Sequence, residues 1–310
     1  MPVTVVGSLN EDVLVEVSRL PGRGETVVGR GSRLAPGGKG ANQAAAAGRL
    51  GPGVRMVGRV GDDAAGERQL EALAGGGVDV GSVRRTPGMP TGSATIPVED
   101  GTGENLIVVV PGANAALTPG DVTGGAVRDA TVLLLQLEVP LAAVRAAAAA
   151  AEGTVVLTPA PPQPLPAGLL ELVDVLVPNE HELLALAGAA PGSRSPDELA
   201  ELARAVTRSA VVVTLAERGA LLVPADGGPP LLQPPPPAPA VDTTGAGDCF
   251  CGALAHALSG GVWLADAVRF AVTAASLSIG GPGARGALPD EASVRALLPA
   301  TPPATRLTGA

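Results

Sequence analysis

The feature that most constrains the fold is a regular alternation of short apolar runs with helical stretches rich in Ala and Leu. Apolar runs of strand length span Val3–Val6, Val54–Val57, Thr131–Leu137, Thr154–Leu157, Val173–Val177 and Val211–Leu215. The main helical stretches between them are Asn42–Leu50, Gly66–Ala74, Leu141–Ala151, Glu180–Ala187 and Pro196–Ser209. Such alternation is typical of βαβ units, in which helices connect parallel strands. We therefore expect an α/β protein with a doubly wound, mostly parallel sheet flanked by helices.

Two segments break this alternation and predict a separate small sheet. Their residues alternate with period two around Gly-rich turns, in Glu11–Val17 with Glu25–Arg30 and in Thr91–Val98 with Glu104–Val110. This pattern is typical of paired strands joined by tight turns. We expect a small antiparallel β flap, built from about residues 11–35 and 91–110, that covers the main domain.

The length of 310 residues fits one large α/β domain. Pro224–Pro239 is dominated by Pro and Gly and is expected to be an extended surface connection, while residues 301–310 read as a flexible tail. Neither indicates a second domain. We expect a single domain over residues 1–300.

Charge and composition disfavour nucleic-acid and membrane partners. The net charge is −9 and the pI about 4.8, so no overall basic field attracts a phosphate backbone or an anionic membrane. Trp263 and two phenylalanines are too few for a base-stacking platform. The first residues lack the basic start of a secretory signal, and uncharged apolar runs stay shorter than the roughly 20 residues of a spanning helix. We expect a cytoplasmic protein.

Cysteine and histidine usage gives no framework for a disulfide or a zinc site. Cys249 and Cys251 are the only cysteines, and their spacing on a helix points them to different sides. His181 and His256 are the only histidines and are expected to have packing or surface roles. We expect both cysteines to be buried small apolar residues.

Lys39 is the only lysine among 21 Lys and Arg residues, and it lies in the glycine-rich string Gly37–Gln43 before an Ala-rich helix. Glycines let the backbone approach a ligand, while Lys39 and Asn42 offer polar groups at the helix start. The string is not a Walker A loop, because Gly40 stands where Ser or Thr would bind Mg²⁺. An ordinary turn with a solvated lysine is the alternative, and the uniqueness of Lys39 favours a binding site.

The string Val241–Asp248 precedes a second helical run, Cys249–Leu258. Backbone N–H groups of Gly245, Ala246 and Gly247 at the positive end of this helix would form an anion hole for a phosphoryl group. Asp248 could accept a proton from an incoming hydroxyl group, so the string suits phosphoryl transfer to an alcohol. The structural alternative is an Asp that caps the helix in a tight turn.

Both strings resemble the paired signatures of the ribokinase-like carbohydrate kinases, also called the phosphofructokinase-B family. The similarity continues through Gly7–Asp12, Gly24–Thr26, Gly112–Leu117, Leu135–Glu138 and Pro178–Glu180. It implies that nearly the whole chain has the family fold and transfers a phosphoryl group from ATP, with Mg²⁺, to a sugar hydroxyl.

The resemblance also implies roles for individual residues. The expected sugar-binding residues are Asn10, Asp12, Gly38, Lys39, Asn42 and Glu138, with Asp248 as the catalytic base beside the anion hole. The expected ATP-binding residues are Asn179, Glu182, Thr214, Leu215, Ala216, Glu217, Arg218, Gly219 and Gly247. Ala216 departs from the family pattern, which usually has glycine, and this weakens the expected nucleotide contact there.

A monovalent cation, K⁺, is a further expectation from the resemblance. Its expected ligand positions are Asp242, Thr244, Ser278, Gly281, Gly283 and Ala287. The string Gly281–Gly286 also matches the G-x-G-x-x-G pattern of dinucleotide-binding proteins. We reject that interpretation because the string follows a helix late in the chain and does not join a strand to a helix.

The resemblance makes the 5-hydroxyl of D-ribose the expected phosphate acceptor. The alternatives are another sugar or nucleoside as substrate, or a sugar-binding regulator without catalysis. The flap segments contain no aromatic residue to stack on a nucleoside base, and the retained Asp248 and its glycines argue against a silent regulator. The apolar strands of the flap also predict a homodimer formed through the flaps.

Overall fold

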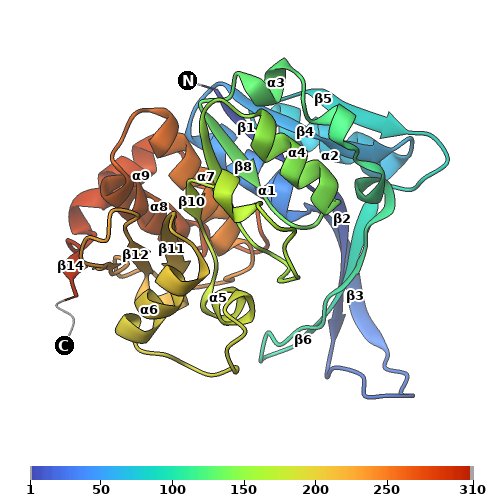
Figure 1. Ribbon diagram of the computed structural model, residues 1–310. Helices are drawn as coiled ribbons and strands as arrows, with labels where there is room; N and C mark the ends of the chain where they lie inside the picture. Colours follow the sequence, from blue (N-terminus) through green and yellow to red (C-terminus); the bar gives the residue numbers. More distant parts are fainter. Residues whose placement is uncertain (1, 308–310) are drawn as a thin grey trace.

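The computed structural model describes residues 2–307 and is built around a ten-stranded sheet (Figure 1). Its strands are β1 (Val3–Val6), β4 (Val54–Gly61), β5 (Val78–Thr86), β8 (Val132–Leu135), β9 (Thr154–Leu157), β10 (Val175–Leu176), β11 (Ala210–Thr214), β12 (Ala220–Val223), β13 (Leu231–Gln233) and β14 (Thr305–Arg306). Their order is β14-β13-β12-β11-β10-β9-β8-β1-β4-β5. Neighbours are parallel from β5 to β11 and antiparallel from β11 to β14. The predicted doubly wound, mostly parallel sheet is confirmed.

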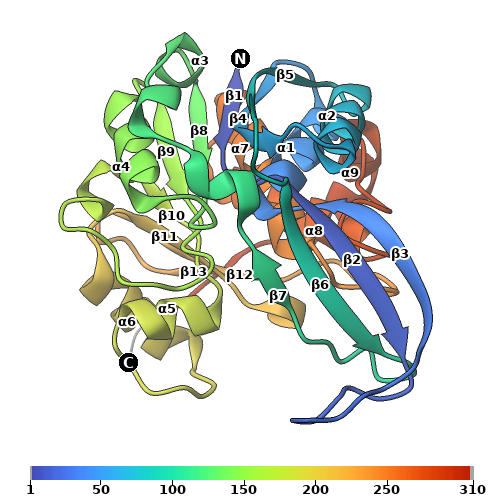
Figure 2. The same ribbon diagram turned by 90° about the vertical axis from the view of Figure 1, so that its right-hand side faces the viewer.

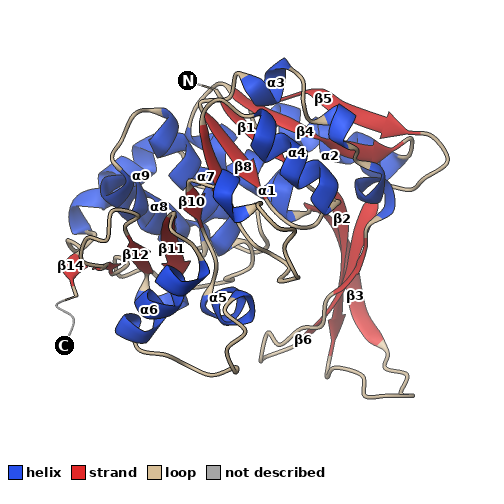
Figure 3. Ribbon diagram, in the orientation of Figure 1, coloured by secondary structure: helices blue, strands red, loops and turns tan. Residues whose placement is uncertain are grey.

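Helices cover both faces of this sheet (Figure 3). They are α1 (Lys39–Leu50), α2 (Ala64–Gly75), α3 (Gly125–Arg128), α4 (Leu141–Ala150), α5 (Glu180–Leu186), α6 (Pro196–Val206), α7 (Ala246–Ser259), α8 (Leu264–Ser278) and α9 (Glu291–Leu297). Successive strand residues point to opposite faces, so Val5 joins the core under α1, α7 and α8, while Val6 joins the core under α4 and α6. Within residues 2–307, no helix combines the length and apolarity needed to cross a membrane.

The flap is a separate four-stranded sheet that projects from the main body (Figure 2). Its order is β3-β2-β6-β7, with bounds Gly29–Gly37, Asn10–Val17, Gly92–Glu99 and Val108–Val110. The outer pairs are antiparallel, and the central pair β2–β6 is parallel. The second strand begins at Gly29 and not at Glu25 as predicted, because the Glu25 carboxylate binds Arg19 and the backbone N–H of Gly22 in a turn.

The C-terminal region is more ordered than the sequence indicated. The Pro-rich connection contains β13, which pairs with β12, and Thr305–Arg306 pairs with the other side of β13 as the edge strand β14. Thr301 is buried, and its hydroxyl lies 2.7 Å from that of Thr273. Within the predicted flexible tail, Thr305–Arg306 thus satisfies the free edge of β13 as a short strand, while flexibility of the tail stays a prediction. Residues 308–310 of that prediction lie outside the described residues.

The strand order reverses between β1 and β8, which positions the site. The chain continues from β1 to β4 and β5 on one side, and from β8 to β11 on the other. In open α/β sheets, ligands bind at the carboxyl ends of the strands beside such a reversal. Ser8, after β1, and Glu138, after β8, meet there through a hydrogen bond of 2.5 Å.

Candidate active site

Asp248, the predicted catalytic base, lies in the first turn of α7. Gly245 precedes the helix with φ 76°, a left-handed conformation that favours glycine. Ala246 and Gly247 then begin the helix, and the first N–H groups of a helix have no partners within it. The N–H of Ala246 donates to the carbonyl of Thr243 at 3.2 Å, whereas those of Gly245 and Gly247 make no such bond within the described residues. These N–H groups and the positive end of the helix dipole are suited to bind a phosphoryl group beside Asp248.

Two amide side chains from the first turns of α1 hold the Asp248 carboxylate. Asn42 Nδ2 donates to Oδ2 at 3.1 Å, and Gln43 Nε2 donates to Oδ1 at 3.2 Å. Gln136 Nε2, after β8, donates to Gln43 Oε1 at 2.6 Å. Burial raises the pKa of Asp248, and the ammonium group of Lys39 and the two amides oppose this rise. A carboxylate with a raised pKa is a better proton acceptor, which suits a general base.

The predicted sugar-binding residues lie close together near Asp248. Asn10, at the start of β2, is buried, and its Oδ1 accepts a hydrogen bond from Asn114 Nδ2 at 2.8 Å. The Glu138 carboxylate accepts hydrogen bonds from Ser8 Oγ and, at 3.1 Å, from the backbone N–H of Lys39. Gly38, with φ 86°, lets the start of α1 approach β2 closely, since a Cβ atom at residue 38 would lie 2.8 Å from the backbone nitrogen of Asn10.

Asp12, on β2, faces the same region. Burial raises the pKa of its carboxyl group to about 6, Arg285 counteracts the rise, and the charges of Glu138 and Asp248 add to it. The structure therefore brings Asn10, Asp12, Gly38, Asn42, Glu138 and Asp248 together, although they come from four separate segments.

A cleft of about 160 Å³ adjoins Asp248 on the side of the α7 N-terminus. Its wall includes Gly245, Ala246 and Gly247, the last of which is a predicted ATP-binding residue, and three further predicted ATP-binding residues, Asn179, Glu182 and Thr214. Lys39 also lines this cleft, so its side chain faces the predicted phosphate region and not the sugar region alone. Burial opposes the charge on Lys39, but Asp248, Glu138 and Glu182 raise its pKa, so it is positively charged at neutral pH.

Asn179 and Glu182 form a reciprocal cap at the start of α5. The Asn179 side chain accepts from the Glu182 backbone at 2.8 Å, and the Glu182 carboxylate accepts from the Asn179 backbone at 2.8 Å. Burial raises the pKa of Glu182. The Glu182 carboxylate on the cleft wall is the acidic group that fits a Mg²⁺ ion carried by nucleotide phosphates.

The predicted nucleotide loop after β11 is only partly in the cleft. Thr214 lines it, whereas Leu215, Ala216, Glu217, Arg218 and Gly219 do not. Ala216 has φ 49° and is, within residues 2–307, the one non-glycine residue with positive φ, which explains why glycine suits this position. Arg218 is engaged by Glu180 at 2.7 Å. Nucleotide contacts from residues 215–219 stay a prediction.

The two segments predicted to hold K⁺ meet beside the anion hole. The Asp242 carboxylate accepts hydrogen bonds from the backbone N–H groups of Thr244 at 2.9 Å and Gly283 at 2.7 Å. Gly281 packs so closely on Ala287 that a Cβ atom at residue 281 would lie 2.9 Å from the Cβ of Ala287. Ser278 ends α8, and its hydroxyl donates to the carbonyl of Ala275. The two segments implied by the resemblance are therefore in contact, and a K⁺ site between them stays a prediction.

Sequence reasoning missed several polar side chains around the site, above all Arg285. Its Nε donates to Asn42 Oδ1 at 2.8 Å, and burial lowers the pKa of its guanidinium group to about 10. No sequence signal separates Arg285 from the other arginines. The sequence could have indicated three others, because each is an amide inside one of the family-like strings: Gln43, Asn114 and Gln136.

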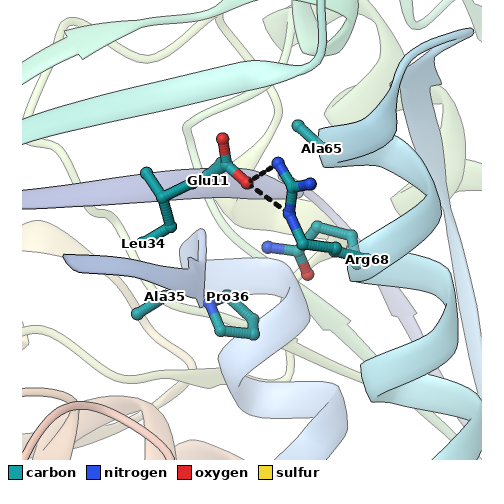
Figure 4. A pocket seen from close by; sticks show the side chains of 7 residues that line it. Glu11, Leu34, Ala35, Pro36, Ala65 and Arg68 are labelled. Atoms are coloured by element: carbon teal, nitrogen blue, oxygen red, sulfur yellow. Dashed lines mark hydrogen bonds and ion pairs between the residues drawn. The ribbon is translucent and has the colours of Figure 1, made fainter.

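A second pocket, of about 40 Å³, lies between the root of the flap and α2 (Figure 4). The ion pair of Glu11 and Arg68 forms one wall, and Leu34 and Pro36 form another. None of the predicted site residues lines it. Gln69 also lines this pocket. It donates to the backbone carbonyls of Asn10 and Gly37 and thereby fixes the backbone that carries the predicted sugar-binding residue Asn10.

Comparison with known proteins establishes the family. The model of the pfkB family carbohydrate kinases matches residues 2–291, so the chain belongs to this family. A ribokinase of Arabidopsis thaliana is 38% identical over 314 residues, which cover 96% of this chain and 81% of that protein.

Solved structures agree with this assignment. A ribokinase from Thermotoga maritima superposes with a TM-score of 0.88 at 34% identity, covering 96% of this chain and 99% of the other. The Arabidopsis thaliana ribokinase complexed with ribose and ATP superposes with a TM-score of 0.85 at 37% identity, covering 96% and 98%.

The raised pKa of Asp12 predicts a pH-dependent effect of Asp12→Asn on stability. The folded-state pKa is about 6 against an ordinary 3.8, so ionisation of Asp12 destabilises the fold as pH rises from 4 to 6. Asp12→Asn removes this penalty and should raise the free energy of unfolding at pH 7.5 by about 1 to 3 kcal/mol, with little gain at pH 4. Urea unfolding at both pH values measures the difference. Exposed Asp129→Asn is the control, and equal gains at both pH values would contradict the assignment.

Proposed function

We propose that this protein has ribokinase activity: it transfers the γ-phosphoryl group of ATP to the 5-hydroxyl of D-ribose and gives D-ribose 5-phosphate and ADP. The observation that carries the proposal is the Asp248 carboxylate, held by two amides at the N-terminus of α7 beside a cleft. A base adjacent to backbone N–H groups at a helix N-terminus is what phosphoryl transfer to an alcohol requires. The relatives named ribokinase, one of them complexed with ribose and ATP, support the choice of substrate.

The proposed mechanism assigns the sugar to the region at the root of the flap where the predicted sugar-binding side chains meet. Asn10, Asp12, Asn42 and Glu138, with the backbone at Gly38, offer the fixed donors and acceptors that a polyol needs. The 5-hydroxyl oxygen attacks the γ-phosphorus while Asp248 accepts its proton. The new O–P bond replaces the bond to the bridging oxygen of ADP, which leaves with the electron pair. The N–H groups at residues 245–247 and the Lys39 ammonium stabilise the charge on the transferring group.

The proposed ATP site lies across the cleft from the sugar. Asn179, Glu182 and Thr214 line that side, and the loop Leu215–Gly219 follows them in the chain. Glu182 would hold Mg²⁺ together with the nucleotide, and the ion would neutralise phosphate charge. The junction of residues 242–244 and 278–287 would hold K⁺, which supports the loop before α7. A cytoplasmic location follows in this proposal from the use of ATP.

A panel of substrates tests the proposal against its alternatives. Purified protein is incubated with ATP, Mg²⁺ and K⁺ and with D-ribose, 2-deoxy-D-ribose, D-fructose or adenosine, and the phosphorylated product is identified by mass spectrometry. We expect D-ribose to have the highest kcat/KM. A higher value for another compound overturns the proposed substrate, and sugar binding without any phosphate transfer favours a sugar-binding regulator.

Asp248→Asn should lower kcat by about two to four orders of magnitude, because the amide cannot accept the hydroxyl proton. Sugar affinity should change little, since the isosteric side chain keeps the local packing. Steady-state kinetics and calorimetric titration with D-ribose measure the two quantities. Asp266→Asn, in the first turn of α8, is the matched control and should keep full turnover. Near wild-type turnover of Asp248→Asn would show that another group is the base.

We also propose a homodimer formed through the flaps. Every residue of β7 is exposed, and the exposed apolar set on the flap comprises Val28, Leu34, Leu106, Ile107, Val108, Val109 and Val110. An apolar patch of this kind on a free sheet is typical of an interface.

Light scattering at micromolar concentration should therefore give the mass of a dimer, and Val109→Glu should give a monomer. Val262→Glu, at an exposed apolar residue near α8, is the control and should leave the mass unchanged. A wild-type monomer with full activity would contradict the dimer and leave the flap as a lid for a single active site.

A further inference from the structure

The Asn42 amide lies between two groups of opposite charge. Its Oδ1 accepts a hydrogen bond from Arg285 Nε at 2.8 Å, and its Nδ2 donates to Asp248 Oδ2 at 3.1 Å. Rotation of the amide by 180° would turn its N–H groups toward a guanidinium and its oxygen toward a carboxylate, and both contacts would be repulsive. Arg285 therefore fixes which end of Asn42 faces Asp248.

The same guanidinium group contacts the root of the flap. Arg285 Nη2 donates to the carbonyl of Gly37, the last residue of β3, at 3.2 Å and to Gln69 Oε1 at 3.4 Å. Gln69 in turn donates to the carbonyl of Asn10, the first residue of β2. The start of β2, which carries Asn10 and Asp12, and the end of β3 are thus connected to Arg285.

Arg285 comes from the loop after α8, which is itself fixed to the segment before α7. The Asp242 carboxylate bonds to the backbone of Gly283 on this loop and to that of Thr244 beside the anion hole. The loop that carries Arg285 is therefore fixed to the segment before α7. The hydrogen bond from Arg285 to Asn42 then connects this loop to α1.

A purely structural role explains this arginine poorly. Arg269, a half-buried arginine of α8, donates to the backbone carbonyls of Leu298 and Thr301. Arg285 instead directs its Nε to a side chain that touches Asp248. Each arginine has one buried nitrogen without a hydrogen-bond partner among the described residues, Nε of Arg269 and Nη1 of Arg285, so the contact with Asn42 is what distinguishes Arg285.

We propose that Arg285 is a positioning residue for the catalytic base: it fixes the orientation of the Asn42 amide, which orients the Asp248 carboxylate toward the sugar hydroxyl. The inference rests on the proposed function for its kinetic consequence, whereas the hold of Arg285 on Asn42 can be measured without turnover.

Arg285→Met should lower kcat at saturating sugar and ATP by about 10- to 100-fold, because misplacing a reacting group by a fraction of an ångström to an ångström costs this much. The KM for ATP should stay within about threefold of wild type, since Arg285 is on the sugar side of Asp248. Arg269→Met is the matched control: it removes a half-buried arginine and should keep kcat.

A double-mutant cycle with Asn42→Ala separates positioning from general destabilisation. If Arg285 acts through Asn42, adding Arg285→Met to Asn42→Ala should lower kcat by less than about threefold further. Losses that multiply fully, or a kcat of Arg285→Met equal to that of Arg269→Met, overturn the proposal. The cycle uses whichever sugar of the panel is phosphorylated fastest.

The direct readout is the Asn42 side-chain amide in a protein labelled with [¹⁵N]asparagine. The chain has five asparagines, so five amide pairs are expected, and Asn42→Ala identifies one of them. Arg285→Met should shift the Asn42 pair and leave those of Asn105 and Asn179 unchanged, whereas an unshifted Asn42 pair overturns the proposal.

This readout stays valid when no sugar is phosphorylated, a result that would overturn the proposed function alone. If Arg285→Met does not fold, Arg285→Lys replaces it in both measurements with the same expected directions, because lysine keeps the charge but lacks the planar donor group that bonds to Asn42.

Discussion

The rest of this structure depends on the hydrogen bonds that hold one half-buried carboxylate, that of Asp248, at the start of a helix. An isolated buried carboxylate would take up a proton, and it stays useful as a base only where donors and positive charge compensate the loss of water. Asp248 receives hydrogen bonds from Asn42 and Gln43 and lies near the Lys39 ammonium and the positive end of α7. The contributing side chains all come from the start of α1, so the position of α1 against α7 decides whether the base works.

The composition of α1 makes that close packing possible. Asn and Gln have short side chains, and they reach Asp248 only if the two helix axes approach closely. Four consecutive alanines, Ala44–Ala47, face the core, and a Cβ atom at Gly252 on α7 would lie 2.5 Å from the backbone carbonyl of Gln43. Small residues on both helices thus allow α1 and α7 to approach closely enough for the amides of Asn42 and Gln43 to reach Asp248.

Local patterns predicted the parts of the structure that depend on neighbouring residues. The alternation of apolar runs with helical stretches predicted the strands of the sheet. The glycine-rich strings predicted that Lys39 and Asp248 lie at the starts of helices, as they do. The sequence could not predict Arg285, which contacts Asn42 across 243 positions of the chain and resembles every other arginine. It also missed β13 and β14, because prolines dominate the surrounding segment and the pairing of Thr305–Arg306 supplies the edge. Lys39 was assigned to the sugar from its motif, but only the fold could show that its side chain also lines the phosphate cleft.

The balance of charge in the site explains how it could accept both a neutral sugar and a negatively charged polyphosphate. Four carboxylates, those of Asp12, Glu138, Glu182 and Asp248, converge on two cationic side chains, Lys39 and Arg285. Burial raises the pKa values of Asp12, Glu182 and Asp248, and the excess of negative charge adds to this effect. A neutral polyol can enter such a site without added charge, because its hydroxyls donate to the carboxylates. A polyphosphate adds further negative charge, so it would enter with a divalent cation, against the positive end of α7 and beside Lys39. The two cationic side chains of the site are accordingly divided: Lys39 lines the cleft where phosphate would lie, and Arg285 lies on the sugar side of Asp248, where it bonds to Asn42.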